Sequence, residues 1–130
     1  MELAVEDEAI DELDHVNNAA YLQYVERIAR AHSVHLGLTT ARFLELGGMF
    51  VVRRHEVLYH SPALAGDVLK LTTYVSEMSG SKCTRHVAIW RRGELLVSAA
   101  TEWVWIDADT RRPKRLPAEI REAFSSGPIA

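Results

Sequence analysis

The sequence lacks the residues that several common classes of protein require. It contains one cysteine, Cys83, so neither an intramolecular disulfide nor a cysteine-based zinc site has support. Its 15 Lys and Arg residues are outnumbered by 18 Asp and Glu residues, which leaves no basic excess for binding along a nucleic-acid backbone. Charged residues interrupt every apolar run well before the roughly 18 residues of a membrane span. We therefore expect no metal site, no nucleic-acid partner and no membrane span.

The remaining composition fits one soluble globular domain. The chain has 130 residues, of which 48% are hydrophobic and 25% are charged, and we place a single domain over residues 1–130. The first eight residues are acidic and have neither the cationic start nor the apolar run of a secretion signal. Together with the lone cysteine, this start predicts a cytoplasmic location.

The segment from Asn17 to Leu36 has the periodicity of a long amphipathic helix. Its apolar stripe contains Tyr21, Leu22, Val25, Ile28, Ala29, His32 and Leu36. Asn17 or Asn18 can cap the first turn, and Gly37 follows as a stop signal. A shorter helix is predicted from Thr39 or Thr40 to Leu46.

After Gly48 the composition changes to β-branched and aromatic residues, interrupted by three turn signals. The predicted strands are Met49–His60, Asp67–Met78, Lys82–Arg91 and Glu94–Asp107, and a short helix is predicted over 117–124. Short connections between the last three strands favour antiparallel meander pairing. One long helix and one long antiparallel sheet can bury each other if the sheet wraps the helix, which predicts an α+β fold.

The stretch immediately before the long helix is the best candidate for chemistry. Unpaired amides and the positive dipole end at a helix start can stabilise an oxyanion on a bound carbonyl. A carboxylate just upstream, such as Asp11, can activate water or attack that carbonyl directly. These two parts suffice for acyl transfer to water. The alternative is that Asp11, Asp14 and the two asparagines only cap the helix.

The same stretch carries a recognisable motif. Its pattern Ile10-Asp11-x-Leu13-x-His15-Val16-Asn17-Asn18-x-x-Tyr21-Leu22, followed by Tyr24, Glu26 and Arg30, resembles the opening of the hydroxybenzoyl-coenzyme A thioesterase family. The order of predicted elements agrees over nearly the whole chain, including the turn Tyr59-x-x-Pro62-x-x-x-Gly66-Asp67. The resemblance implies the hot-dog fold, in which an antiparallel sheet wraps a long central helix.

The resemblance also implies an activity and an assembly. Members hydrolyse acyl-coenzyme A (acyl-CoA) thioesters to a free carboxylic acid and coenzyme A, which is part of the substrate, so no separate cofactor is expected. Protomers pair edge to edge with active sites at the dimer interface, which implies a homodimer or a homotetramer.

Carried over by position, the resemblance assigns roles to six residues. Asp11 falls on the catalytic aspartate, as general base or nucleophile, and the backbone amide at about Asn18 falls on the oxyanion donor. Lys82 matches, more loosely, a region that brings cations to the phosphates of coenzyme A. His15 is a secondary catalytic candidate, and Asn17 and Tyr21 are predicted to contact the substrate.

One departure from the pattern keeps other functions open. Asp14 stands where relatives commonly have glycine before the His-Val-Asn-Asn run, so the turn can differ locally. A non-catalytic acyl-thioester binding protein is therefore one alternative. A hot-dog hydratase or dehydratase is another, with His15 and Asp11 directed at the acyl β-carbon.

Overall fold

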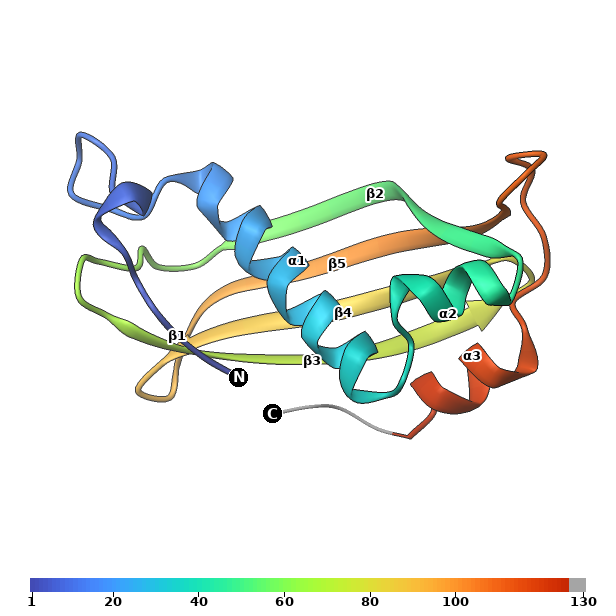
Figure 1. Ribbon diagram of the computed structural model, residues 1–130. Helices are drawn as coiled ribbons and strands as arrows, with labels where there is room; N and C mark the ends of the chain where they lie inside the picture. The colour runs from blue at the N-terminus through green and yellow to red at the C-terminus, as the bar shows by residue number, and fades with distance from the viewer. Residues whose placement is uncertain (127–130) are drawn as a thin grey trace.

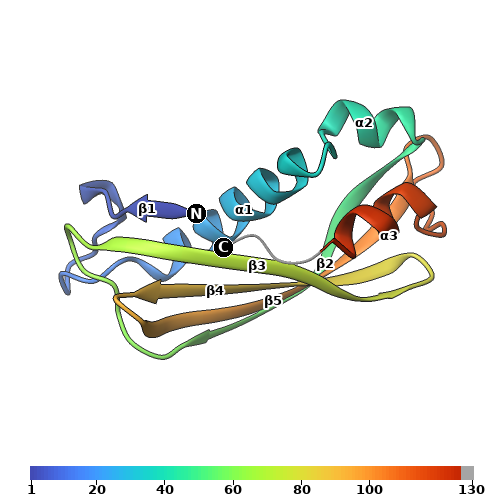
Figure 2. The same ribbon diagram turned by 90° about the horizontal axis from the view of Figure 1, so that it is seen from below.

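The protein consists of a curled antiparallel sheet with a long helix lying across one of its faces (Figure 1; Figure 2). The computed structural model describes residues 1–126. The five strands are β1 (Glu2–Ala4), β2 (Gly48–Tyr59), β3 (Val68–Ser79), β4 (Lys82–Arg91) and β5 (Glu94–Asp107). Their order in the sheet is β1-β3-β4-β5-β2, and each neighbouring pair is antiparallel. The helices are α1 (Asn18–His35), α2 (Thr40–Glu45) and α3 (Ala118–Phe124), with a short 3-10 helix, η1 (Asp7–Ala9), before α1.

This arrangement confirms the predicted α+β fold and the meander of the last three strands. The strand β2 pairs with β5 and is one edge strand of the sheet, since its other side has no neighbouring strand within the described residues. Sequence analysis missed β1, because three residues are too few to show a period of two. β1 pairs with β3 and forms the edge of the sheet opposite to β2.

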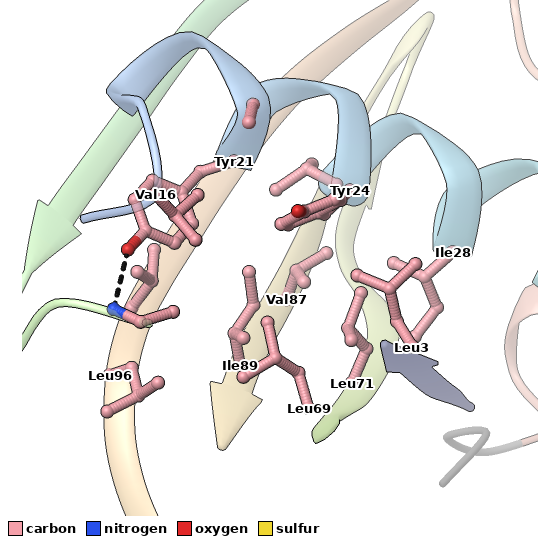
Figure 3. Close-up of a cluster of buried hydrophobic side chains, with 14 of the residues drawn as sticks. Leu3, Val16, Tyr21, Tyr24, Ile28, Leu69, Leu71, Val87, Ile89 and Leu96 are labelled. Atoms are coloured by element: carbon pink, nitrogen blue, oxygen red, sulfur yellow. Dashed lines mark hydrogen bonds between the residues drawn. The ribbon is translucent and has the colours of Figure 1, made fainter. Parts of the chain in front are cut away.

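The helix α1 packs its apolar face on the sheet along most of its length. Its buried residues are Ala20, Tyr21, Tyr24, Val25, Ile28 and His32. Tyr24 lies outside the predicted stripe, yet it is buried beside Tyr21, with the two rings nearly perpendicular and 6.2 Å apart. Beneath the first half of α1 lies a dense apolar core that includes Leu69, Leu71 and Ile89 (Figure 3).

A second core lies at the other end of the sheet. It gathers Trp105, Leu116, Ile120 and Phe124 beneath α2 and α3. At this end β2 starts with Gly48, where a side chain would put its Cβ 2.5 Å from the Trp105 ring. Within residues 1–126, no helix is long and apolar enough to cross a membrane.

Candidate functional site

The loop before α1 is fastened to the body of the protein by main-chain contacts. Ile10 and Val16 pair across an antiparallel bridge, and the Asp11 amide donates to the His15 carbonyl oxygen at 2.9 Å. The Val16 amide donates to the Ala63 carbonyl oxygen, also at 2.9 Å. The position of this loop therefore depends on backbone bonds more than on its exposed side chains.

The Asp11 carboxylate is fixed through one of its two oxygens. Its Oδ1 accepts hydrogen bonds from the backbone amides of Leu13 at 2.9 Å and His15 at 3.3 Å. Within residues 1–126, Oδ2 accepts no hydrogen bond from the protein, and the side chain is only partly buried. A carboxylate held in this way is oriented and still has a free oxygen for water or a carbonyl carbon.

Asp14 takes the backbone conformation that glycine would favour. Its φ is +60°, in the left-handed region, and its amide donates to the Asp11 carbonyl oxygen at 3.1 Å. Aspartate is one of the few residues that visits this region with moderate cost. The turn therefore keeps a glycine-like geometry although the glycine is absent.

The start of α1 separates the roles of the two asparagines. Asn17 is the N-cap, since its Oδ1 accepts from the Ala19 amide at 2.8 Å. Asn18 is the first residue of the helix, and its backbone amide has no acceptor in the part of the chain that the structure describes. Asn17 thus behaves as the capping alternative requires, whereas Asp11 bonds within its own loop and does not cap α1.

Two further residues of the motif are placed differently. Tyr21 is buried, its hydroxyl oxygen accepts from the Ala63 amide at 3.0 Å, and burial raises its pKa (Figure 3). It supports the loop from below, and direct contact with a substrate stays a prediction. The His15 backbone bridges to Leu64, while its imidazole forms no hydrogen bond within residues 1–126.

Lys82 lies far from these groups within one protomer. It begins β4, whereas Arg91 ends that strand beside the Asp11 loop, so roughly 30 Å of extended chain separates the two ends. The structure therefore brings Asp11, His15, Asn17, Asn18 and Tyr21 to one end of the molecule and places Lys82 at the other (Figure 1).

Arg91 is a cation at the Asp11 end; in the sequence it belongs to one of several Arg pairs that could meet phosphates, and it is not among the six predicted site residues. Its guanidinium donates to Asp67 Oδ2 at 2.8 Å and to the Pro62 carbonyl oxygen at 3.2 Å. Burial tends to raise the pKa of Asp67, but the bonds from Arg91 and the Leu64 amide hold it below its ordinary value. In the sequence, Asp67 is visible as part of the Pro-x-x-x-Gly-Asp turn. That Arg91 is its ion-pair partner is evident only from the folded sheet.

Two hollows accompany these groups. The smaller one, of about 260 Å³, borders the helix start and includes Asn17 in its wall. A larger one of about 760 Å³ lies under α2 and the second half of α1, and none of the six predicted site residues lines it. Among residues 1–126, no three His, Cys, Asp or Glu side chains come together as a metal site.

The chain is similar to known thioesterases over nearly its whole length. A model of the thioesterase-like superfamily matches residues 5–124. The long-chain acyl-CoA thioesterase FadM of Escherichia coli K12 is 27% identical over 115 residues, covering 87% of this chain and 86% of FadM.

Solved structures agree with this assignment. A thioesterase from Thermus thermophilus, complexed with coenzyme A and Zn, is 31% identical with a TM-score of 0.81, covering 97% of this chain and 90% of that one. The 1,4-dihydroxy-2-naphthoyl-CoA thioesterase Slr0204 from Synechocystis has a TM-score of 0.88 at 19% identity, with 97% and 94% covered, which shows a shared fold. The protein therefore has the hot-dog fold and belongs to the thioesterase-like superfamily.

Proposed function

We propose that the protein hydrolyses acyl-CoA thioesters to a carboxylic acid and coenzyme A, with Asp11 as the group that activates water. The observation that carries this proposal is that two groups occur at the same end of α1. One is the Asp11 carboxylate, which is held through Oδ1 while Oδ2 accepts no hydrogen bond within residues 1–126, and the other is the Asn18 backbone amide, which has no acceptor there. The acyl-CoA thioesterase FadM, similar to this chain over 87% of its length, supports the substrate class.

The chemistry needs only groups of this loop. Asp11 Oδ2 takes a proton from a water molecule, and the water oxygen forms a bond to the thioester carbonyl carbon. The carbonyl oxygen becomes an oxyanion that accepts a hydrogen bond from the Asn18 amide at the positive end of α1. The carbon–sulfur bond then breaks, and the thiolate of coenzyme A leaves and is protonated. Direct attack by Asp11 would instead form an anhydride that water hydrolyses.

We further propose a homodimer built through β2. This strand has one free edge within the described residues, and several of its large apolar side chains are exposed, with Leu58 at 53% and Tyr59 at 47%. A long, exposed, apolar edge strand is prone to pair with another copy. Lys82 is assigned to coenzyme A phosphates in a site shared between protomers, because it lies too far from Asp11 of its own chain. Tetramers and a cytoplasmic location stay predictions.

Thiol release from acyl-CoA substrates, followed with a thiol-reactive dye, tests the proposal. Asp11→Asn preserves an oxygen that can accept from the Leu13 and His15 amides, so the loop should stay in place while the base is lost. We expect kcat to fall at least about a hundredfold. Asp14→Asn is the matched control, since it also removes one carboxylate from this loop and asparagine tolerates a positive φ. Its kcat should stay within about threefold of the wild type.

Equal kcat values for the wild type and Asp11→Asn would exclude Asp11 from the mechanism. Acyl-CoA binding without thiol release from short, long or aromatic acyl groups would instead indicate a binding protein. Water addition to an enoyl-CoA, dependent on His15 and Asp11, would indicate a hydratase.

A further inference from the structure

The large cavity offers a second, distinct environment for a ligand. Its volume of about 760 Å³ is typical of small-molecule sites. Most of its wall is apolar and comes from α1, α2 and β2, including Ala29, Val34, Phe43, Leu44, Met49 and Phe50. An apolar wall of this kind suits a hydrocarbon chain or ring.

One wall of the cavity carries a buried cation. Arg85 of β4 is 3% exposed, and no carboxylate among residues 1–126 forms an ion pair with it. Burial lowers its pKa to about 10, so the guanidinium remains positive at neutral pH. Burying a charge without a counter-ion is costly, and proteins normally pair such groups.

The groups around Arg85 solvate it without neutralising it. Its Nη1 donates to His32 Nδ1 at 2.9 Å and to Thr73 Oγ1 at 3.1 Å, and its Nη2 lies 3.5 Å from Ser33 Oγ. Phe124 places its ring 5.5 Å from the guanidinium carbon. All of these partners are uncharged, since His32 must be deprotonated at Nδ1 to accept, and they leave other guanidinium N–H groups for a ligand.

A second buried donor points to the same kind of ligand. The indole Nε1 of Trp103 is buried with no hydrogen-bond partner within residues 1–126, and Trp103 lines the cavity together with Arg85 and Cys83. Buried donors without acceptors are rare and call for an explanation. The Nε1 of Trp105 also has no partner within residues 1–126, but Trp105 does not line the cavity. An oxygen-rich anion is the kind of ligand that accepts hydrogen bonds from both an indole N–H and a guanidinium.

Charged residues of α1 also line the cavity. Ser33, next to Arg85, and Glu26 both line it, and their separation of seven positions corresponds to roughly 10 Å along the helix. Glu26 is exposed and forms no ion pair within residues 1–126, so the pairing with Arg30 that their spacing favours is not made. The exposed cation Arg30 lines the cavity as well, so the buried Arg85, and not the charges of α1, favours the anion end of a ligand at one place.

We propose that this cavity binds an apolar chain that ends in a carboxylate, with the carboxylate on Arg85 and Trp103 Nε1. Such a ligand has two sources: a free carboxylic acid, or the far end of a substrate whose acyl group carries a second carboxylate. Only the second source rests on the proposed thioesterase function. It also rests on the proposed dimer, because Arg85 and Asp11 of the same chain lie near opposite ends of α1, farther apart than a ten-carbon acyl chain spans.

The direct test is calorimetric titration of the full-length protein with decanoate and with 1-decanol, below their aggregation limits. The two probes share an alkyl chain and differ in the charged end. We expect decanoate to bind at least tenfold more tightly. Equal affinities, or no binding of decanoate, would overturn the proposal without any variant.

Variants then locate the carboxylate. Arg85→Met and the milder Trp103→Phe, which removes only the N–H group and part of the ring, should weaken decanoate binding by at least tenfold and about threefold. Neither should change the affinity for 1-decanol. Arg115→Met removes an exposed cation outside the cavity and should leave both affinities unchanged. Decanoate binding that survives both cavity variants contradicts the assignment.

Turnover distinguishes the two sources. If the ligand is the far end of the substrate, decanedioyl-CoA should exceed decanoyl-CoA in kcat/KM at least tenfold, and Arg85→Met should abolish this preference. If decanoate binds through Arg85 and both thioesters react equally, the ligand is the free acid. Failure of both thioesters to react, with decanoate still bound through Arg85, would refute the proposed function and leave the carboxylate site standing.

Discussion

Asp11 and Arg85 lie near opposite ends of α1, and the chain holds these two charged groups by different means. Asp11 is on a loop, is partly exposed, and is fixed by backbone amides no more than four residues away. Arg85 is buried, and its partners come from α1, β3 and α3, up to 53 residues away in the sequence. One site is made by local backbone geometry, whereas the other exists only after the sheet, helices and cavity have assembled.

The packing beneath α1 differs in the same way. The first half of the helix lies on a continuous apolar core that contains Tyr21, Tyr24 and Ile28 (Figure 3). The second half lies over the cavity, where Ser33 and Val34 border open space. A rigid support therefore lies beneath the Asp11 loop, and room for a ligand lies at the other end.

Shortening one side chain of α1 over the apolar core and one beside the cavity should show the largest difference in stability. Ile28 is fully buried in the first core, so Ile28→Ala should lower the free energy of unfolding by about 3 kcal/mol. Val34 is 54% exposed at the cavity, so Val34→Ala should change it by less than about 0.5 kcal/mol. Urea titrations measure both values. Similar losses would mean that the second half of α1 is packed as tightly as the first.

The thiol of Cys83 reports on the buried wall of the cavity. Burial raises its pKa from 9.0 to about 11, which corresponds to about a hundredfold less thiolate at pH 8. Because only the thiolate reacts, iodoacetamide labelling should be slow and should keep accelerating with pH up to about 11. The urea-unfolded protein serves as control and should level off near pH 9. A folded-state plateau near pH 9 would show that solvent reaches the thiol.

Most of the fold could be predicted because its signals are local. The stripe and caps of α1 and the turns between the long strands are written in neighbouring residues, and the structure confirms them. The Asp11 side chain follows the same logic, since both amides that donate to it lie within four residues. At Asp14 the expectation is that the turn can differ locally, whereas its φ of +60° is a conformation that glycine favours.

The parts that could not be predicted depend on contacts across the sheet. Arg85 shares the buried face of β4 with Cys83, Val87 and Ile89, but nothing local shows that α1 and α3 would cover an arginine at this position. Lys82 illustrates the same limit, because a motif match cannot reveal that a whole strand separates it from Asp11 within one chain.

Substitutions of the N-cap residue Asn17 test whether local hydrogen bonds stabilise the Asp11 end of α1. Asn17→Ala removes the acceptor for the Ala19 amide and should cost about 1 kcal/mol of stability by thermal or urea unfolding. Asn17→Asp retains an acceptor at a favourable dipole position and should cost less than about 0.3 kcal/mol. If both variants lose the same amount, the side chain stabilises the protein through contacts other than the cap.

The pair Asp67–Arg91 should give the smallest effect and a definite pH dependence. The two side chains are 19% and 22% exposed, so the ion pair is partly screened and Asp67→Asn should cost less than about 1 kcal/mol at pH 7. The pKa of Asp67 is lower in the folded protein than in the unfolded chain. The stabilisation is therefore complete above the unfolded value near 3.9 and is lost as the pH falls through the folded value.

Below that pH the wild-type carboxyl is neutral and resembles the asparagine of the variant. The difference in unfolding free energy between the two proteins should consequently shrink toward zero as urea titrations are repeated from pH 7 down to about pH 2.5. A difference that stays constant over this range would show that the charge of Asp67 does not contribute, because the bonds from both Arg91 and the Leu64 amide favour the ionised carboxylate. The ion pair would then contribute nothing to holding the 62–64 segment against the Asp11 loop.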